Sequence, residues 1–265
     1  MIAALLALLL FAPGTVHALE PVSAFDDGFA VPSATTLTEA AFGYPGAESF
    51  IGEAFAAGAW SVPYGVSDLA VSSAIAGYGH GGFGLSLAYT GTGFDLYGDE
   101  QEKVGVSWGP VKRVSAGVRL TRTAMRIRGF GEASAWSSDI GVILRPADKV
   151  FLAGSWEDVA SAELGDSEEP LDGRVRFAAS WEIDDHATLI ASANKVRRFD
   201  VSYSAGLTVT AADVLTLGML GANEPDRFEY LCGVTFGNAQ TSYRGSYHRD
   251  LGATHGFFLS WKANR

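Results

Sequence analysis

The stretch KVGVSWGPVKRVSAGVRLT, residues 103–121, alternates larger apolar residues with small or polar ones on both sides of a Gly-Pro turn. Val104 and Val106 share one face of the first half, and Val118 and Leu120 share one face of the second half. An alternation of period two indicates a β-strand with one apolar face, and two such runs around a turn indicate a β-hairpin. We therefore interpret residues 103–121 as a hairpin whose two faces meet different surroundings.

The same alternation recurs along the rest of the chain, with about fourteen strand candidates from residue 53 onward. Short turns, such as residues 109–113 and 145–149, alternate with longer or more polar connections, such as residues 90–102 and 157–173. Tight periplasmic turns that alternate with longer outer loops are typical of bacterial outer-membrane barrels, and an even strand number places both termini in the periplasm. The sequence thus predicts an all-β fold, an antiparallel up-and-down transmembrane β-barrel of about 14 strands with a short N-terminal arm or plug.

A soluble β-sandwich also contains many short strands, so the polar face of the strands decides between the two folds. Charges on that face would be costly in a sandwich core but would line the lumen of a barrel cheaply. Aromatic residues also gather near the strand ends, as in the interfacial girdles of membrane barrels. The candidate lumen-lining residues are Arg119, Asp139, Arg174, Arg176, Glu182, Asp200, Glu229 and Arg244.

The composition argues against several classes of function. The chain has 265 residues, 48% of them hydrophobic, and a formal charge of -11 without a basic patch, which argues against nucleic-acid binding. Cys232 is the single cysteine, and no metal or cofactor motif is present. The seven carboxylates of residues 157–172 lack the spacing of a calcium loop. His248 and Asp250 form the one pair suited to acid–base chemistry, but without a nucleophile motif we expect no enzyme.

The N-terminus predicts export. Residues 2–13 are apolar over the length of a signal-peptide core, which is too short to span a bilayer as a helix, and a small-residue cleavage site follows at residues 16–18. We expect residues 1–18 to be a signal peptide, residues 19–51 an N-terminal arm or short plug, and residues 52–265 the barrel. The predicted location is the bacterial outer membrane.

Several segments together resemble a known family: AWSVPYGVSDLAVSSAIAGYGHGGFGLSLAYTGTG, the hairpin SWGPVKRVSAGVRL, and SSDIGVILRPADKVFLAGSWED. In the spacing of their strands and turns they are similar to the FadL-type and PorV/PorQ-like outer-membrane barrels. The resemblance implies fourteen strands and either transport or binding of a small hydrophobic or amphipathic molecule, or a docking or scaffold role in a secretion system. The Asn-Pro-Ala signature usual before the first strand of these families is missing, and Pro45, Gly46 and Ala47 stand near its place.

Two questions about partners stay open. The lumen-lining charges either pair across the barrel or guide a solute or the head group of an amphipathic ligand. The basic cluster of Lys195, Arg197 and Arg198 either pairs with the acidic segment 157–172 or faces anionic lipopolysaccharide. The expected partners are therefore outer-membrane lipid or lipopolysaccharide, a hydrophobic small molecule, and secretion-system proteins.

Overall fold

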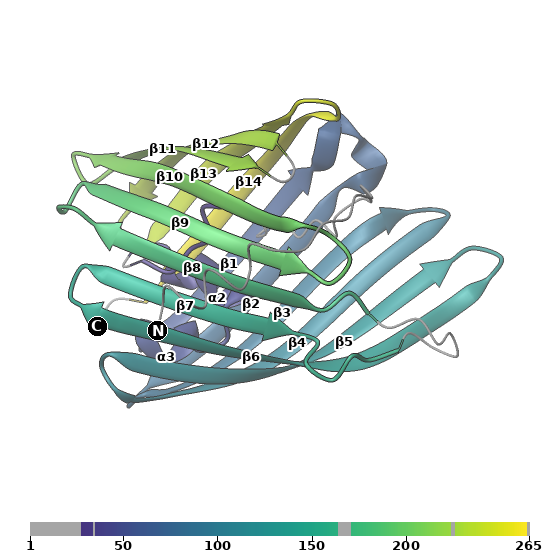
Figure 1. The fold of residues 1–265 in the computed structure, drawn as a ribbon, viewed down its shortest axis with the longest axis horizontal. Helices are drawn as coiled ribbons and strands as arrows, with labels where there is room; N and C mark the ends of the chain where they lie inside the picture. The colour runs from purple at the N-terminus through teal and green to yellow at the C-terminus, as the bar shows by residue number, and fades with distance from the viewer. Residues whose placement is uncertain (1–27, 34, 164–170, 224–225, 264–265) are drawn as a thin grey trace.

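A computed structural model describes residues 28–33, 35–163, 171–223 and 226–263. Within these residues, fourteen strands close into a single antiparallel barrel, in which consecutive strands pair and β1 pairs with β14 (Figure 1). The predicted fold and strand number are confirmed. The strands are β1 (Ala54–Val62), β2 (Val71–His80), β3 (Phe83–Phe94), β4 (Tyr97–Val111), β5 (Val114–Ile127), β6 (Gly131–Ala147), β7 (Val150–Glu157), β8 (Arg174–Glu182), β9 (Ala187–Val196), β10 (Val201–Ala211), β11 (Leu215–Asn223), β12 (Asp226–Phe236), β13 (Ala239–His248) and β14 (Gly252–Lys262).

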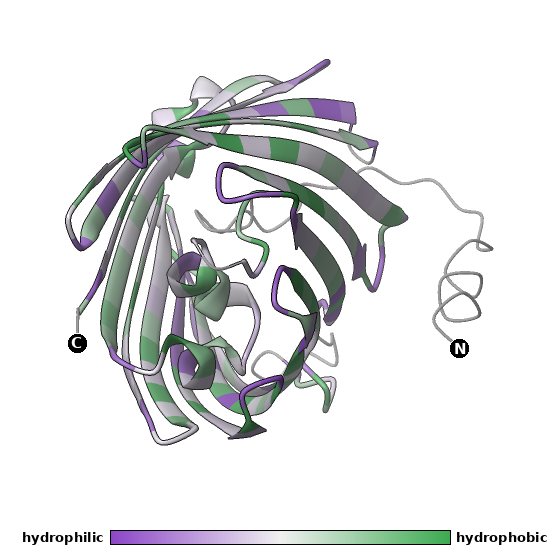
Figure 2. Ribbon diagram, turned by 90° about the vertical axis from the view of Figure 1, so that its left-hand side faces the viewer, coloured by the Kyte–Doolittle hydropathy of each residue, from purple (hydrophilic) through white to green (hydrophobic). Residues whose placement is uncertain are grey.

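The part of the N-terminal arm that the structure describes lies inside the barrel (Figure 2). This inner segment, residues 28–33 and 35–52, contains two short helices, α2 (Leu37–Gly43) and α3 (Ala47–Ile51). No helix in the described part of the chain is long and apolar enough to cross a membrane. The predicted signal peptide, residues 1–18, lies outside the described residues.

The two faces of the opening hairpin are the ones that the alternation predicts. Val104 and Leu120 are 48% and 50% exposed on the outer face, whereas Arg119 is 3% exposed on the inner face. Because side chains of a strand point alternately to opposite sides, the whole wall has an apolar outer surface and a mixed, buried inner surface. An apolar surface of this extent fits lipid rather than water.

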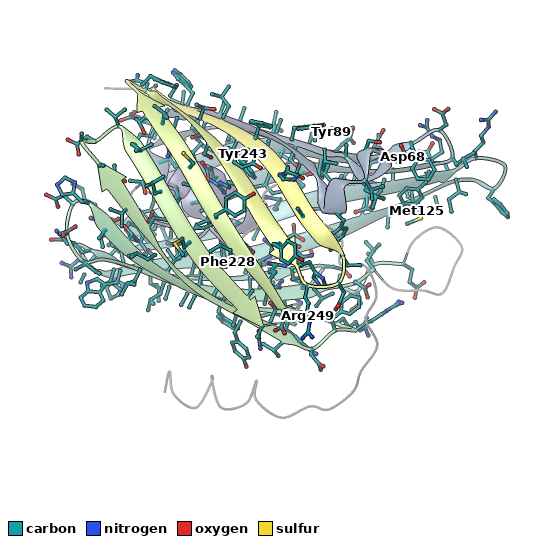
Figure 3. The ribbon with its side chains drawn as sticks, turned by 90° about the horizontal axis from the view of Figure 1, so that it is seen from above. Asp68, Tyr89, Met125, Phe228, Tyr243 and Arg249 are labelled. Carbon is teal, nitrogen blue, oxygen red and sulfur yellow. The ribbon has the colours of Figure 1, made fainter. Side chains whose placement is uncertain are left out.

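Aromatic side chains border this apolar belt at both ends. Figure 3 shows Phe228 and Tyr243 on the outer side of the wall. Such girdles mark the two interfaces of a bilayer, where an aromatic ring meets both hydrocarbon and head groups. The exposed aromatic residues include Tyr78, Phe83, Trp108, Trp181, Phe236 and Trp261 near one end of the strands, and Trp60, Tyr89, Trp136, Trp156, Phe228 and Tyr247 near the other.

The two ends of the barrel differ. The short-turn end carries turns such as residues 81–82, 112–113 and 148–149. The opposite, loop end carries the connection from β1 to β2, with two 3-10 turns, η1 (Pro63–Gly65) and η2 (Ser67–Leu69), and the connection from β7 to β8.

One predicted outer loop is wrong. Residues 90–102 belong mostly to β3 and β4, which continue to a turn at residues 95–96. The strands from β3 to β6 thus extend at the loop end beyond the rest of the wall (Figure 1). Ion pairs across the strands replace apolar contacts there: Arg122 lies 3.2 Å from Glu102 and 3.7 Å from Glu132. Polarity alone therefore does not end a strand that has left the bilayer.

Candidate functional site

Arg119 joins the wall to the inner segment. Its guanidinium donates hydrogen bonds of 2.5 Å to the carbonyl oxygens of Phe42 and Ala41, at the C-terminal end of α2. A third contact, of 3.3 Å, reaches a carboxylate oxygen of Glu48 in α3. Both charged side chains are almost fully buried, which is tolerable only because each finds opposite charge and hydrogen bonds.

Glu48 has further partners on the wall and in its own segment. One carboxylate oxygen accepts a hydrogen bond of 2.8 Å from the Ser86 hydroxyl of β3. The other accepts one of 2.9 Å from the backbone N–H of Gly46. The pair of Arg119 and Glu48 thus fixes α2 and α3 against β3 and β5.

A second buried ion pair holds the inner segment to the opposite part of the wall. Arg244 of β13 donates to Glu39 of α2, and both side chains are about 5% exposed or less. The Arg244 guanidinium also lies 4.1 Å from the ring centroid of Phe258 in β14, a cation–π contact. The inner segment is therefore anchored at both sides of the lumen.

Glycines of the wall let the inner segment approach closely. A Cβ atom at Gly117 in β5 would lie 2.4 Å from the backbone nitrogen of Gly46, and one at Gly141 in β6 would lie 2.4 Å from the carbonyl oxygen of Pro45. A Cβ at Gly79 in β2 would meet the Glu48 carbonyl oxygen at 2.5 Å. These contacts are to backbone, so any larger side chain would displace the inner segment.

Asp139 lies beside Arg119 across the strand pair of β5 and β6 but has other partners. Its carboxylate accepts hydrogen bonds from the Thr121 hydroxyl at 2.9 Å and from the backbone N–H of Asp158 at 3.1 Å. Lys103 is buried on the same inner face, with its ammonium 5.1 Å from the ring centroid of Phe42. This part of the wall therefore concentrates charge around α2.

The remaining predicted residues occupy different places. In β8, Arg176 pairs with Glu157 at 2.9 Å, and its guanidinium also lies against α2, where a Cβ atom at Gly43 would be 2.8 Å from Nη1. Glu229 of β12 pairs with Arg227 at 2.6 Å and accepts a hydrogen bond of 2.9 Å from the backbone N–H of Gly28 in the inner segment. The structure thus brings Arg119, Arg176, Arg244 and Glu229 to the inner segment.

Two other members of the predicted set lie in β8, and one lies outside the strands. Arg174 is buried at the first residue of β8, and Glu182 is half-buried at its last. Asp200 does not face the lumen: it is exposed in the connection between β9 and β10, because β10 begins one residue later than expected. It is therefore not part of the candidate site.

The inner segment and the wall also share an apolar cluster. One small cavity beside this cluster has a volume of about 50 Å³ and is lined by Tyr44, Arg176 and Asn194 among others. The interior is therefore largely a packed mixture of aromatic rings and paired charges around the inner segment. The cluster includes Phe29, Val31, Phe42, Tyr44, Phe55, Phe151, Leu220, Leu231 and Phe258.

Sequence reasoning missed Glu39, Glu48, Glu157 and Arg227, which pair with predicted charges, and Lys103, which is buried on the same inner face. A signal existed for three of them. Lys103 shares the strand face of Gly105, and Glu39 and Glu48 are isolated carboxylates in a segment of small residues. Carboxylates in a segment predicted to enter a lumen that carries arginines are natural partners for those arginines.

The other candidate sites have structural explanations. His248 accepts hydrogen bonds of 3.1 Å at Nδ1 from the backbone N–H groups of Asp250 and Leu251, so it stabilises the turn before β14. Arg198 of the basic cluster pairs with Asp172 of the acidic segment at 2.9 Å. For this residue, the structure thus shows pairing with the acidic segment. Among the residues described, no group of three or more His, Cys, Asp or Glu side chains is placed to hold a metal ion.

Comparison with known proteins finds solved structures that have the same fold. No protein-family model matches the chain, and no curated protein sequence is similar to it. The Pseudomonas putida toluene transporter TodX has the same fold, with a TM-score of 0.66 at 10% identity over 94% of this chain and 99% of that chain. A Pseudomonas aeruginosa FadL homologue has a TM-score of 0.59 at 11% identity, covering 86% of this chain and 95% of that one. At such identities the likeness concerns the fold alone.

Proposed function

We propose that the protein is an outer-membrane channel for a small hydrophobic or amphipathic molecule. The observation that carries this proposal is the interior, where aromatic and aliphatic side chains of the wall and the inner segment lie beside buried arginines. A lumen for ions or sugars would be polar and water-filled. Apolar surface next to fixed charge suits a solute with a hydrocarbon body, with or without a polar head.

The structural neighbours also support a role in the passage of hydrophobic molecules. TodX is described as a toluene transporter, and CymD, with a TM-score of 0.59 at 7% identity, as a monoaromatic hydrocarbon channel. In our proposal the chain is exported by its signal peptide, the short-turn end faces the periplasm, and lipopolysaccharide surrounds the loop end. The inner segment then acts as a plug that must shift for a solute to pass.

Uptake into whole cells tests the proposal. A lipopolysaccharide leaflet slows the passive entry of hydrocarbons, so cells that produce the protein should take up a radiolabelled monoaromatic hydrocarbon faster than cells that lack it. Swelling of proteoliposomes in a sugar solution serves as the control and should stay at the level of empty liposomes. Sugar permeation as fast as through a general porin, without faster hydrocarbon uptake, would refute the proposal.

The alternative is a non-transporting barrel that serves as a docking or scaffold component of a secretion system, as in PorV-like proteins. The anchoring of the inner segment by two buried ion pairs favours this reading, because a barrel that never opens needs no labile plug. Absence of uptake for every solute class, together with co-purification of secretion-system proteins, would support the scaffold and exclude the channel.

A further inference from the structure

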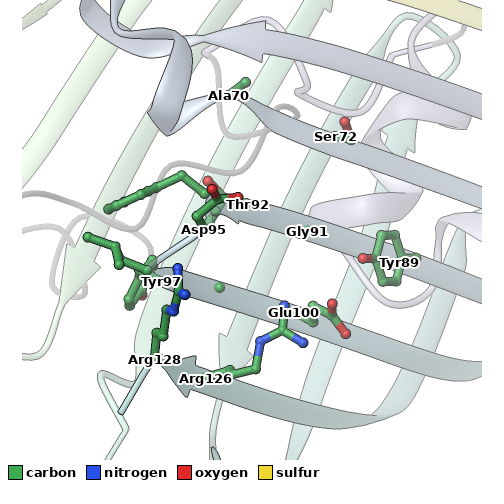
Figure 4. Close-up of a pocket in the computed structure, with 14 residues that line it drawn as sticks. Ala70, Ser72, Tyr89, Gly91, Thr92, Asp95, Tyr97, Glu100, Arg126 and Arg128 are labelled. Carbon is green, nitrogen blue, oxygen red and sulfur yellow. The ribbon is translucent and has the colours of Figure 1, made fainter. Parts of the chain in front are cut away.

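A groove with a volume of about 720 Å³ lies where β3, β4 and β5 extend at the loop end (Figure 4). Tyr89, which lines it, is 41% exposed, whereas its chain neighbours Ala88 and Thr90 are buried on the inner face. Since strand residues alternate between faces, the groove opens on the outer surface of the barrel rather than into its lumen.

Glycines form the floor of the groove. Gly93 has a φ of +147°, and a Cβ atom there would lie 2.4 Å from the carbonyl oxygen of Tyr97, so only glycine fits. Gly98 pairs with Gly93 across the strands, and the Arg126 side chain lies over it, with Nη2 at 3.8 Å from the position of a Cβ. The floor is thus open backbone next to a guanidinium.

The strand register places this guanidinium at the level of lipid head groups. Tyr89 of β3 lies opposite Glu102 of β4, and Glu102 lies opposite Arg122 of β5. Arg122 in turn lies opposite Trp136 of β6. This row of paired residues therefore contains two aromatic residues of the girdle, Tyr89 and Trp136. Arg126 lies four residues farther along β5, which is about 13 Å at 3.3 Å per residue. A site just beyond the aromatic girdle faces the polar part of a membrane.

The charges of the groove differ from those of the girdle row. Arg122 is paired with two glutamates. The guanidinium groups of Arg126 and Arg128, by contrast, form no ion pair or hydrogen bond within the described part of the chain, although two carboxylates, those of Asp95 and Glu100, line the same groove. Two exposed guanidinium groups beside open backbone are suited to phosphate, which they bind through planar, charge-assisted hydrogen bonds.

We propose that this groove binds the phosphorylated head group of a lipid in the surrounding leaflet. Arg126 and Arg128 hold the phosphate, and the acyl chains run down the apolar belt past Tyr89 and Leu87. The inference rests on the membrane location in the proposed function but not on transport. The carboxylates of Asp95 and Glu100 weaken the attraction, so they limit the affinity for an anionic head group.

Binding of lipid A to the full-length protein in neutral detergent micelles tests the site, with fluorescent lipid A carrying both phosphates and its dephosphorylated form as probes. The double variant Arg126→Ala/Arg128→Ala should bind the phosphorylated form about tenfold more weakly, as expected for the loss of charge-assisted contacts at an exposed site. Glu100→Gln should bind it more tightly. Lys112→Ala/Arg113→Ala, which removes two charges from the turn at the other end of the same strands, is the matched control and should bind as the parent does.

Each outcome decides the proposal. Equal binding of the two lipid forms by the parent, or an equal loss in the double variant and the control, would overturn it. Heat-modifiable gel migration verifies that every variant is a folded barrel. A folded protein that binds lipid A but gives no hydrocarbon uptake would refute the channel and leave the lipid site supported. Hydrocarbon uptake without lipid A binding would refute the lipid site and leave the channel supported.

Discussion

Arg119 shows how one residue of the wall determines where the inner segment lies. A guanidinium has several donors in a fixed plane, and here they meet two carbonyl oxygens of α2 and the carboxylate of Glu48. Lysine has no such planar fork, so it would not reproduce the arrangement. The alternation of residues 103–121 predicts that Arg119 points inward, but its partner comes from a segment without strand periodicity.

Glu48→Ala should loosen the inner segment without opening the barrel. It removes one partner of a buried ion pair, which typically costs about 3–5 kcal/mol, and we expect about 3 kcal/mol because Arg119 keeps its bonds to α2. The exposed pair of Glu102 and Arg122 offers the control, since Glu102→Ala should cost about 0–1 kcal/mol. Hydrogen exchange of the amides in α2 and α3 measures the local free energy of opening. Equal exchange in both variants would contradict the assigned role of Glu48.

At the scale of elements, the strands were predictable and the docking of the inner segment was not. Period-two alternation is a local property, so all fourteen strands appear in the sequence near their observed positions. The docking of α2 and α3 depends instead on backbone contacts with Gly117 and Gly141, which lie far away in the chain. Asp200 illustrates the uncertainty of strand ends, where a shift of one residue moves a side chain from the wall to a connection.

The turn between β8 and β9 should show a pH dependence. Hydrogen bonds of 2.8 Å from the backbone N–H groups of His186 and Ala187 hold the pKa of the Asp184 carboxyl below its usual value. A lowered folded-state pKa means that the stabilisation is present above the pKa of the unfolded chain and is lost as the pH falls through the folded-state value. Asp184→Ala should therefore be less stable than the parent at pH 7, and the difference should vanish as the solution becomes strongly acidic.

Urea unfolding in phosphatidylcholine vesicles at several pH values measures this difference. Asp184→Asn is the matched control, because its amide oxygen still accepts the two hydrogen bonds but does not titrate. A difference between the parent and Asp184→Ala that is the same at all pH values would show that the carboxylate charge has no part in the turn.

At the scale of the whole molecule, the outer belt defines a membrane protein. Leu87 lies on the outer face of β3 between the two aromatic girdles, and Leu96 lies in the turn that extends beyond them. Leu87→Arg should lower the free energy of unfolding in vesicles by about 2–4 kcal/mol, because a charge near the bilayer centre loses its hydration. Leu96→Arg should change it by about 0–1 kcal/mol, as at an interface. Equal effects at both positions would argue against a membrane-spanning belt.

The central claim is that hydrophobic solutes pass through this barrel when the inner segment moves. The hydroxyl groups of Ser49 in α3 and Ser115 in β5 lie 2.5 Å apart, so cysteines at both positions, in a Cys232→Ser background, can tie the segment to the wall. Uptake of a radiolabelled monoaromatic hydrocarbon is then measured in the same cells after oxidation and again after reduction, with the single variant Ser115→Cys as the control. We predict that oxidation stops uptake in the double variant alone and that reduction restores it. Equal uptake in the oxidised and reduced states, with the disulfide verified by gel, would contradict the account.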